Sequence, residues 1–285
     1  MIHRRIGMWT GIASLIACAM VVIAFIALLL FDMGRQGIPV LSWEFLTHFP
    51  RQGMTEGGIW PAIFGTTLLT ILTTLLSAPI GIACAVWLEE YAAEDRFTQL
   101  TRAAIRNLAG VPSIVYGLFG LAIFVEGMHM GASVLASACT LALLTLPSVI
   151  ATAEEALRQV PRSLREGALA LGATRWEVTY TLVLPTALPG ILTGVVLALS
   201  RAAGETAPIL FTGVAFYTRY LPGSLFDEFM ALPYHLYILS TQHHEPEQVR
   251  PLAYGTAVTL LLLVFLLNLF AFGLRAYYRQ KKRFL

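Results

Sequence analysis

The sequence predicts an all-α integral membrane protein with six transmembrane helices and with both termini in the cytoplasm. Hydrophobic residues make up 57% of the 285 residues and charged residues only 13%, whereas soluble domains are about 25% charged. The apolar residues are gathered in runs of about 20, the length that an α-helix needs to cross the hydrocarbon core of a bilayer. The distribution of arginine and lysine between the runs indicates the orientation.

Six segments are long and apolar enough to form the transmembrane helices. They cover residues 8–31, 61–88, 108–126, 132–152, 186–212 and 253–275. The first run is longer than the core of a signal peptide and no small-residue cleavage site follows it, so we expect a retained span. In the third, Pro112 is expected to kink the beginning of the helix.

The basic residues place both ends of the chain on the cytoplasmic side. With a cytoplasmic N-terminus, 14 of the 19 lysines and arginines fall in segments inside the cell, four fall in segments outside, and Arg201 lies within a span. Cytoplasmic loops of membrane proteins carry such an excess. Basic residues beside spans contact anionic lipid headgroups, so we expect membrane lipid, and no nucleic acid, as their partner.

The sequence lacks the elements of a nucleotide-hydrolysing enzyme. Its two lysines, Lys281 and Lys282, lie at the C-terminus, outside any G-x-x-x-x-G-K-[ST] pattern, and that phosphate-binding loop requires a lysine. The sequence also contains no Ser-x-x-Lys, G-x-S-x-G or H-E-x-x-H pattern of a hydrolase. His243, His244 and Glu245 have no further ligand spaced to complete a metal site. We therefore predict a chain that is not an enzyme and binds no cofactor or metal itself.

The longest cytoplasmic segment, about residues 153–185, predicts two short helices. Pro161 suits the first turn of a helix and Gly172 suits its end. Thr174 followed by Glu177 is a capping box that begins a second helix. The spacing places Leu164, Ala168 and Leu171 on one face of the first helix, and Arg162, Arg165, Glu166 and Leu169 on the other. This periodicity alone fits an amphipathic loop on the bilayer surface equally well.

Residues 166–185, EGALALGATRWEVTYTLVLP, resemble the EAA loop of bacterial ABC importer permeases. The residues that carry the resemblance are Glu166, Gly167, Ala168, Gly172, Leu182, Leu184 and Pro185. Gly167 replaces a more usual alanine and Leu182 replaces an isoleucine. The resemblance implies a type I ABC importer permease fold, in which this loop is the coupling helix that docks on a separate ATPase subunit. It implies ATPase coupling through Glu166, Gly167, Ala168, Leu169 and Gly172.

Two charged residues, Arg201 and Glu205, fall inside the fifth predicted span. Each isolated charge costs about 2.5–3.5 kcal/mol there on insertion scales, and a spacing of four allows them to pair. A neutral ion pair that joins two helices is one explanation. The other is a translocation path in which the Arg201 guanidinium binds an oxyanion while Glu205 orients it. The spacing places Gly194, Arg201, Glu205, Pro208 and Thr212 on one stripe.

Residues 108–125 (LAGVPSIVYGLFGLAIFV) and 200–213 (SRAAGETAPILFTG) resemble the A-type permease subunits of phosphate ABC importers, the PstA type. The resemblance runs from about residue 60 to the last span. It implies that Arg201, Glu205 and Thr206 belong to the substrate pathway. It also implies a paralogous C-type permease partner, two copies of a cytoplasmic ATPase subunit that bind ATP and Mg, and a periplasmic phosphate-binding protein.

With this resemblance, the chain is expected in the bacterial cytoplasmic (inner) membrane, as a permease subunit of an ATP-driven phosphate importer. It divides into residues 1–60 (first helix and periplasmic loop), 61–275 (ABC transmembrane type-1 permease domain) and 276–285 (basic cytoplasmic tail). Three alternatives stay open. They are a permease for molybdate or sulfate, a component that signals phosphate status, and an ion-gradient-driven transporter, which leaves the EAA loop unexplained.

Three further groups of polar residues receive structural interpretations. The acidic run of Glu89, Glu90, Glu94 and Asp95 is expected to be solvated, with contact to the ATPase subunit as the alternative. Asn268 is expected to form a hydrogen bond between helices. The long segment 213–252 is expected to form an interfacial or re-entrant segment that helps to receive the binding protein.

Overall fold

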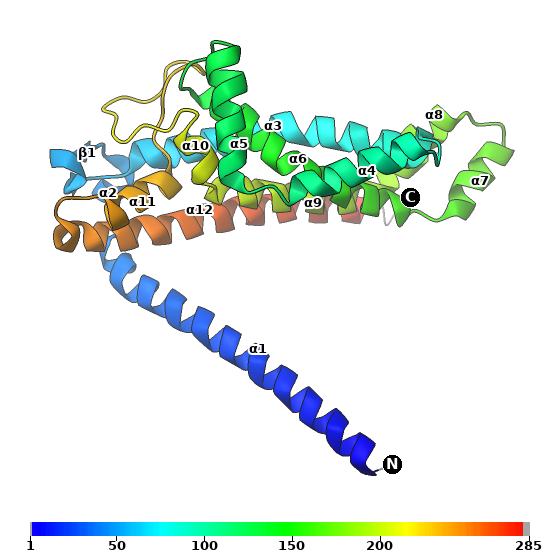
Figure 1. The fold of residues 1–285 in the computed structure, drawn as a ribbon, viewed down its shortest axis with the longest axis horizontal. Helices are drawn as coiled ribbons and strands as arrows, with labels where there is room; N and C mark the ends of the chain where they lie inside the picture. The colour runs from blue at the N-terminus through cyan, green and yellow to red at the C-terminus, as the bar shows by residue number, and fades with distance from the viewer. Residues whose placement is uncertain (1, 282–285) are drawn as a thin grey trace.

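The computed structural model describes residues 2–281 and is largely helical (Figure 1). Its helices are α1 (Ile2–Gly37), α2 (Trp43–Thr47), α3 (Trp60–Val86), α4 (Arg96–Ala109), α5 (Ser113–Gly120), α6 (Val134–Arg158), α7 (Arg162–Ala170), α8 (Arg175–Val178), α9 (Leu184–Gly204), α10 (Ala207–Leu210), α11 (Leu232–Thr241) and α12 (Pro246–Lys281). Tight 3-10 turns form η1 (Ile38–Val40) and η2 (Gln52–Met54), and π-helical turns form η3 (Trp87–Tyr91), η4 (Leu121–Gly127) and η5 (Thr179–Val183).

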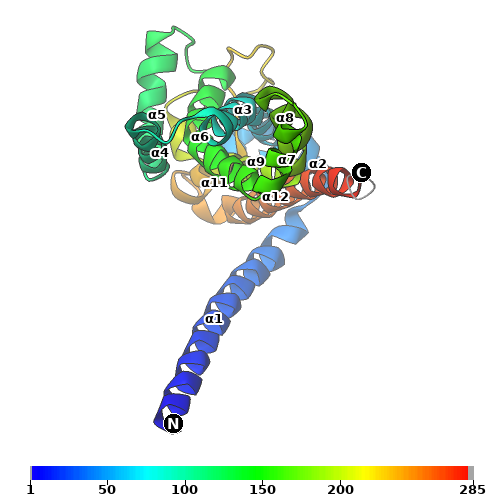
Figure 2. The same cartoon turned by 90° about the vertical axis from the view of Figure 1, so that its right-hand side faces the viewer.

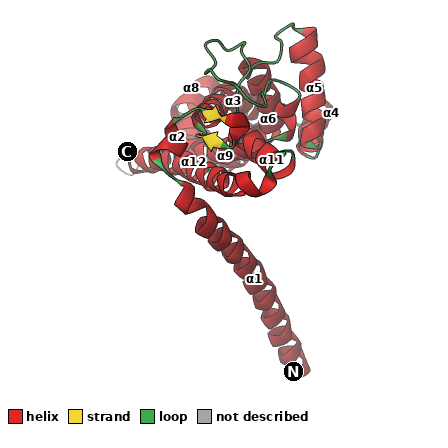
Figure 3. Cartoon of the chain, turned by 90° about the vertical axis from the view of Figure 1, so that its left-hand side faces the viewer, coloured by secondary structure: helices red, strands yellow, loops and turns green. Residues whose placement is uncertain are grey.

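Four long helices, α3, α6, α9 and α12, pack into an elongated bundle (Figures 1 and 2). α6 lies between α3 and α9, and α9 packs against α12. The short antiparallel hairpin of β1 (Pro50–Arg51) and β2 (Glu56–Gly57) lies at one end of the bundle, beside α2 (Figure 3). α7 and α8 lie at the other end (Figure 1).

Among residues 2–281, five helical segments are long and apolar enough to cross a membrane. They are Gly11–Val40, Trp60–Tyr91, Val134–Arg158, Arg175–Gly204 and Pro246–Tyr277. Each contains most of one predicted span. The bent pair of α4 and α5 brings the number to six when it is counted as one broken span.

The third predicted span, 108–126, is not one continuous helix. Its first two residues belong to the end of α4, and the rest of the span begins with α5 at Ser113. α4 ends at Ala109, α5 begins at Ser113, and the chain bends by 102° between the two helical segments. Pro112 lies at the break in an extended conformation, with φ −57° and ψ 140°. A proline lacks the N–H that would continue the helix, and its ring disfavours a helical conformation of the preceding residue. The predicted kink is therefore a sharp corner between an amphipathic helix and an apolar one.

α1 stands apart from the bundle over most of its length (Figures 1 and 2). None of the apolar window in its candidate span is buried by the rest of the chain. It meets α12 near its own C-terminal end, where Gly37 lies against the Tyr254 backbone and the Tyr254 hydroxyl donates to Asp32 over 3.3 Å. The apolar surface of α1 is thus available to lipid or to another chain.

Glycines allow the central helices of the bundle to approach closely. Gly81 of α3 lies against Val149 of α6, and Gly194 of α9 lies against Thr152 of α6. Small residues at such contacts let helix backbones pack tightly where lipid removes the hydrophobic drive between helices.

Replacing Gly194 with leucine is expected to destabilise the bundle, because even a Cβ atom there would overlap the Thr152 side chain. Overpacking of a dense core costs about 1–3 kcal/mol. The midpoint of thermal unfolding of the solubilised protein should therefore fall. Gly273→Leu is the matched control, since a Cβ atom at Gly273 meets nothing within 4 Å. Equal midpoints for the two variants would contradict the close α6–α9 contact.

Residues 232–241 of the predicted 213–252 segment form α11, which packs against α3 and α12 and buries His235. The Leu232 amide donates to the Thr66 hydroxyl over 2.8 Å and fixes the beginning of α11. The Nδ1 atom of His235 has no hydrogen-bond partner among the described residues. Burial lowers the pKa of His235 to about 4, so its ring is neutral near pH 7.

Mild acid is expected to destabilise the protein through His235. The ordinary pKa of histidine is 6.5, and the pKa of His235 in the folded protein is about 4, so the unfolded chain binds the proton first. The stabilisation is complete above pH 6.5 and is lost as the pH falls towards 4, by roughly 3 kcal/mol in total. Thermal midpoints at pH 7 and pH 5 should differ more for the parent than for His235→Leu. The same pH dependence in both proteins would contradict this role.

Candidate coupling surface and intramembrane charge pair

The segment of about residues 153–185 forms the two short helices predicted from its start and stop signals, α7 and α8. Thr174 and Glu177 form the predicted capping box. The Thr174 amide donates to Glu177 Oε2 over 2.7 Å, and the Glu177 amide donates to Thr174 Oγ1 over 3.3 Å. Gly172 turns the chain between the helices with φ +91°, a conformation that glycine adopts without strain.

The faces of α7 differ from the prediction. Arg165 and Ala168 are half-buried, and the other residues of α7 are exposed. Ala168 packs against the buried cluster at the base of the loop. Leu171 was expected to share the face of Ala168, but it is 91% exposed. The helix ends one residue earlier, so helical periodicity no longer sets the direction of this side chain.

The exposed residues of the segment 162–172 form a surface at the end of the molecule, here called the coupling surface. Of the predicted coupling residues, Glu166, Gly167, Leu169 and Gly172 are exposed, and Ala168 anchors α7 to the bundle. Three of its residues are exposed leucines: Leu164 (44% exposed), Leu169 (43%) and Leu171 (91%). Exposed apolar patches with a charged rim are typical of protein contacts.

Beneath α7, the acidic run at the end of α3 is only partly solvated. Glu94 is exposed, and Asp95 caps α4 by accepting from the Thr98 amide over 2.8 Å. Glu89 and Glu90, however, form ion pairs with arginines that lie 69 and 75 residues further along the chain. The expectation of solvation is wrong for these two carboxylates. The sequence offered one indication of these ion pairs, which is the excess of arginine in the segment 153–183.

The predicted charge pair in the fifth span is present. Arg201 Nε lies 3.3 Å from Glu205 Oε1, with 43% of the arginine side chain and 17% of the glutamate side chain exposed. The bond engages Nε, and the terminal guanidinium nitrogens make no hydrogen bond among the described residues. The pair therefore has donors available to a ligand or to another chain.

The predicted span 186–212 ends earlier than expected, at the charge pair. α9 stops at Gly204, Glu205 leaves the helix with φ −74° and ψ 132°, and Thr206 precedes the short helix α10. Glycine is a poor helix former, and Pro208 disfavours helix continuation before it. A break of this kind frees backbone groups, which inside a membrane is tolerated where they face protein or a water-filled cavity.

The predicted polar stripe does not extend along the whole segment. Gly194 packs against Thr152. Thr212 is buried, with its hydroxyl 2.9 Å from the Ser137 hydroxyl. Arg201 and Glu205 remain together because they lie on the last turn and the cap of one helix. Beside them, Ser200 donates to Asn268 over 2.5 Å, which confirms the predicted hydrogen bond between helices.

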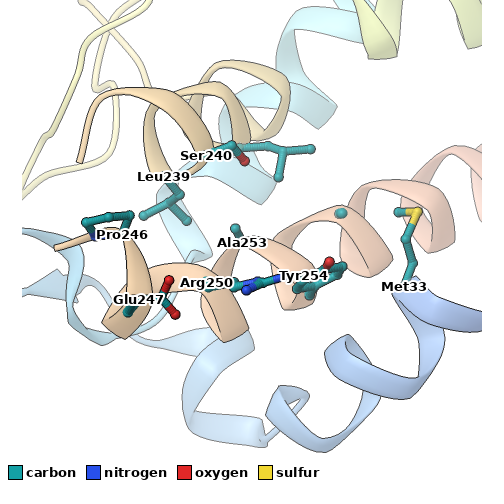
Figure 4. Close-up of a pocket in the computed structure, with 10 residues that line it drawn as sticks. Met33, Leu239, Ser240, Pro246, Glu247, Arg250, Ala253 and Tyr254 are labelled. Atoms are coloured by element: carbon teal, nitrogen blue, oxygen red, sulfur yellow. The ribbon is translucent and has the colours of Figure 1, made fainter. Parts of the chain in front are cut away.

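A cavity of about 410 Å³ lies at the junction of α1, α11 and α12 (Figure 4). Arg250, Glu247 and Tyr254 line it together with apolar side chains such as Leu239 and Ala253. Its lining includes neither the charge pair nor any residue of the coupling surface. It is therefore separate from both candidate sites.

Comparison with known proteins identifies the family. Residues 77–284 match the family described as binding-protein-dependent transport system inner membrane component. The chain is 36% identical over 256 residues to the phosphate transport system permease protein PstA of Pasteurella multocida, covering 90% of this chain and 88% of that protein. It is 33% identical over 273 residues to the probable ABC transporter permease protein YqgI of Bacillus subtilis, covering 92% of each.

Solved structures share the fold. A bacterial alginate ABC transporter in complex with an alginate pentasaccharide-bound periplasmic protein matches with a TM-score of 0.68 and 15% identity over 92% of each chain. The inward-facing MetNI methionine ABC transporter matches with a TM-score of 0.62 and 18% identity, covering 76% of this chain and 94% of that chain. These likenesses confirm the type I ABC importer permease fold. The chain is an inner-membrane transport component and belongs to the family of binding-protein-dependent transport system inner membrane components.

Proposed function

We propose that this chain is a permease subunit of an ATP-driven phosphate importer. The observation that carries the proposal is the half-exposed Arg201, held by Glu205 where α9 breaks. Relatives about 35% identical over most of the chain are named phosphate transport system permease proteins. A planar, permanently charged guanidinium suits a tetrahedral oxyanion, which it can bind through two parallel hydrogen bonds.

Arg201, Glu205 and Thr206 form the substrate pathway in this proposal. In the empty state Glu205 balances the charge of Arg201 through Nε. Phosphate would bind the terminal nitrogens of the guanidinium, and the hydroxyl of Thr206, which follows Glu205 at the helix break, would offer a further hydrogen bond. Transport requires that phosphate can dissociate from Arg201 again. The carboxylate of Glu205 offers the guanidinium an ion-pair partner when phosphate leaves.

ATP hydrolysis would be performed by partner chains and not by this chain. A cytoplasmic ATPase subunit, present in two copies, would hold ATP and Mg and dock on the coupling surface. A paralogous C-type permease would complete the pathway, and a periplasmic phosphate-binding protein would deliver the substrate. This arrangement requires the coupling surface and both termini to be cytoplasmic, in agreement with the distribution of basic residues.

The proposed permease domain is the segment 61–275, preceded by the helix and hairpin of residues 1–60. The described core clusters draw no residue from α1, which supports the separation of this helix from the bundle. Phe45 and Ile59, however, pack in one cluster with Ala62, so the end of the 1–60 segment contributes to the core of the permease domain. The proposed basic tail, 276–285, begins as a continuation of α12 up to Lys281. Residues 282–285 of the tail lie outside the described residues.

Uptake of labelled phosphate tests the proposal in cells that lack their own A-type subunit but keep the other components. The parent chain should restore uptake, and unlabelled phosphate should compete while sulfate and molybdate should not. Cells with an empty vector are the control, and the amount of the chain in the membrane is measured in parallel. Restoration of sulfate or molybdate uptake without phosphate uptake would overturn the proposed substrate and leave the permease fold standing.

A further inference from the structure

Arg165 connects the coupling helix α7 to the end of α3. Its Nη2 and Nε atoms donate to the two carboxylate oxygens of Glu90 in η3, over 2.8 Å and 3.3 Å. The side chains are 18% and 10% exposed. Paired donors of a guanidinium on one carboxylate fix the relative orientation of both groups as well as their distance.

The same guanidinium also holds the end of α6. Nη1 donates to the Val160 carbonyl over 2.6 Å, and Nη2 donates to the Leu157 carbonyl over 2.8 Å. The last carbonyls of a helix have no partner within the helix, and a cation there interacts favourably with the helix dipole. Arg165 thus ties three elements, α7, η3 and α6, through four hydrogen bonds of one side chain.

Few other contacts hold α7 in place. It contains no fully buried residue, and Ala168 is the other half-buried residue in it. A polar cavity of about 670 Å³ lies beside the pair, lined by residues of α7, α4 and the α3–α4 connection, including Glu166 and Arg162. Because open space lies on this side of α7, the Arg165–Glu90 pair supplies a rigid connection that apolar packing does not.

A second group of ion pairs lies nearby and leaves α7 out. Arg102 of α4 lies 3.1 Å from Glu154 of α6, and Arg158 at the end of α6 lies 3.0 Å from Glu89 of η3. These contacts join α4, α3 and α6 into one unit. Among the described residues, Arg165 is the ion-paired residue of α7, so it joins the coupling helix to that unit.

We propose that Arg165 and Glu90 are positioning residues that transmit movement of α7 to α3 and α6 during transport. This inference rests on the proposed function, in which an ATPase subunit moves the coupling surface. A displacement of α7 pulls directly on the cytoplasmic ends of two helices of the bundle, because the paired hydrogen bonds resist both stretching and rotation. Lysine cannot replace Arg165, since it is a single point charge and lacks the planar arrangement of donors.

The ratio of phosphate transported to ATP hydrolysed tests this role in the complete transporter reconstituted in vesicles. Arg165→Lys and Glu90→Gln should lower the ratio at least fivefold, while ATP hydrolysis stays within twofold of the parent. Arg96→Met is the control, because Arg96 is exposed at the beginning of α4 and makes no ion pair among the described residues. An unchanged ratio in both variants would overturn the inference. Loss of the bound ATPase subunit would overturn it too, since Arg165 would then serve docking.

A distance measurement separates this inference from the proposed substrate. Spin labels at the exposed positions Ser163 and Glu94, in a complex free of native cysteines, report the separation of α7 from the end of α3. Pulsed electron spin resonance should show a narrow distribution for the parent and a broader one for Arg165→Lys. This result does not depend on the transported ion. If the parent moves no phosphate but Arg165→Lys still broadens the distribution, the proposed function alone is refuted. Identical distributions in the parent and the variant would refute the connection.

Discussion

Exchanging Arg201 for alanine is expected to lower phosphate uptake about 100-fold, with an unchanged amount of the chain in the membrane. Each hydrogen bond to a charged group contributes about 1.5–3 kcal/mol, and 2.7 kcal/mol corresponds to a factor of 100. The exchange also leaves Glu205, whose side chain is 17% exposed, without its ion-pair partner. Its carboxylate would then repel the incoming anion. Initial rates of labelled phosphate uptake measure the effect.

Arg201→Lys is the matched variant for this experiment. Lysine keeps the positive charge but offers no paired donors, so uptake should fall to a level between those of the parent and Arg201→Ala. If Arg201→Ala spares uptake and alters only phosphate-dependent gene expression, the chain reports phosphate status and the charge pair is structural. If Arg201→Lys behaves like the parent, charge alone is sufficient and the proposed geometry of binding is wrong.

Reversing the charge of Glu166, by Glu166→Lys, is expected to lower uptake more than tenfold by weakening the contact with the ATPase subunit. Glu166 is exposed on the coupling surface, so the exchange removes no buried contact of this chain. Misplaced charges in a protein interface cost several kcal/mol, well above the 1.4 kcal/mol that corresponds to a factor of ten. The measurements are phosphate uptake and the amount of ATPase subunit that co-purifies with the permease.

Glu155→Lys provides the control for Glu166→Lys. Glu155 is also an exposed glutamate, but it lies on α6, outside the coupling surface. This variant should retain both uptake and bound ATPase subunit. Equal losses in the two variants would indicate a general effect of charge, and normal uptake with Glu166→Lys would show that this residue is dispensable for coupling.

The sequence was sufficient to predict those features of the structure that depend on residues close together in the chain. The capping box of Thr174 and Glu177 predicts the beginning of α8, and the spacing of Arg201 and Glu205 predicts their ion pair. The apolar runs predict the spans because membrane insertion depends on hydropathy summed over about 20 residues.

Helix ends and distant contacts were harder to predict. Apolar residues continue on both sides of Arg201 and Glu205, so hydropathy summed over the run 186–212 gives no sign that α9 stops at the charge pair. The pairing of Arg165 with Glu90 joins residues 75 positions apart. Neither residue belongs to the recognised pattern, and only the packing of α3, α6 and α7 brings them together.

α1 and the helical bundle have different structural roles, because α1 stands apart from the bundle. Its apolar window is not buried by the bundle, and the described core clusters contain residues from Val40 onwards. Removal of α1 would therefore leave the interior of the bundle filled. The helix therefore attaches the bundle to the surrounding lipid or to a neighbouring chain and does not fill the bundle's interior. Its sequence is consequently free to change with bilayer thickness or neighbouring chains, without altering the machinery that carries the substrate.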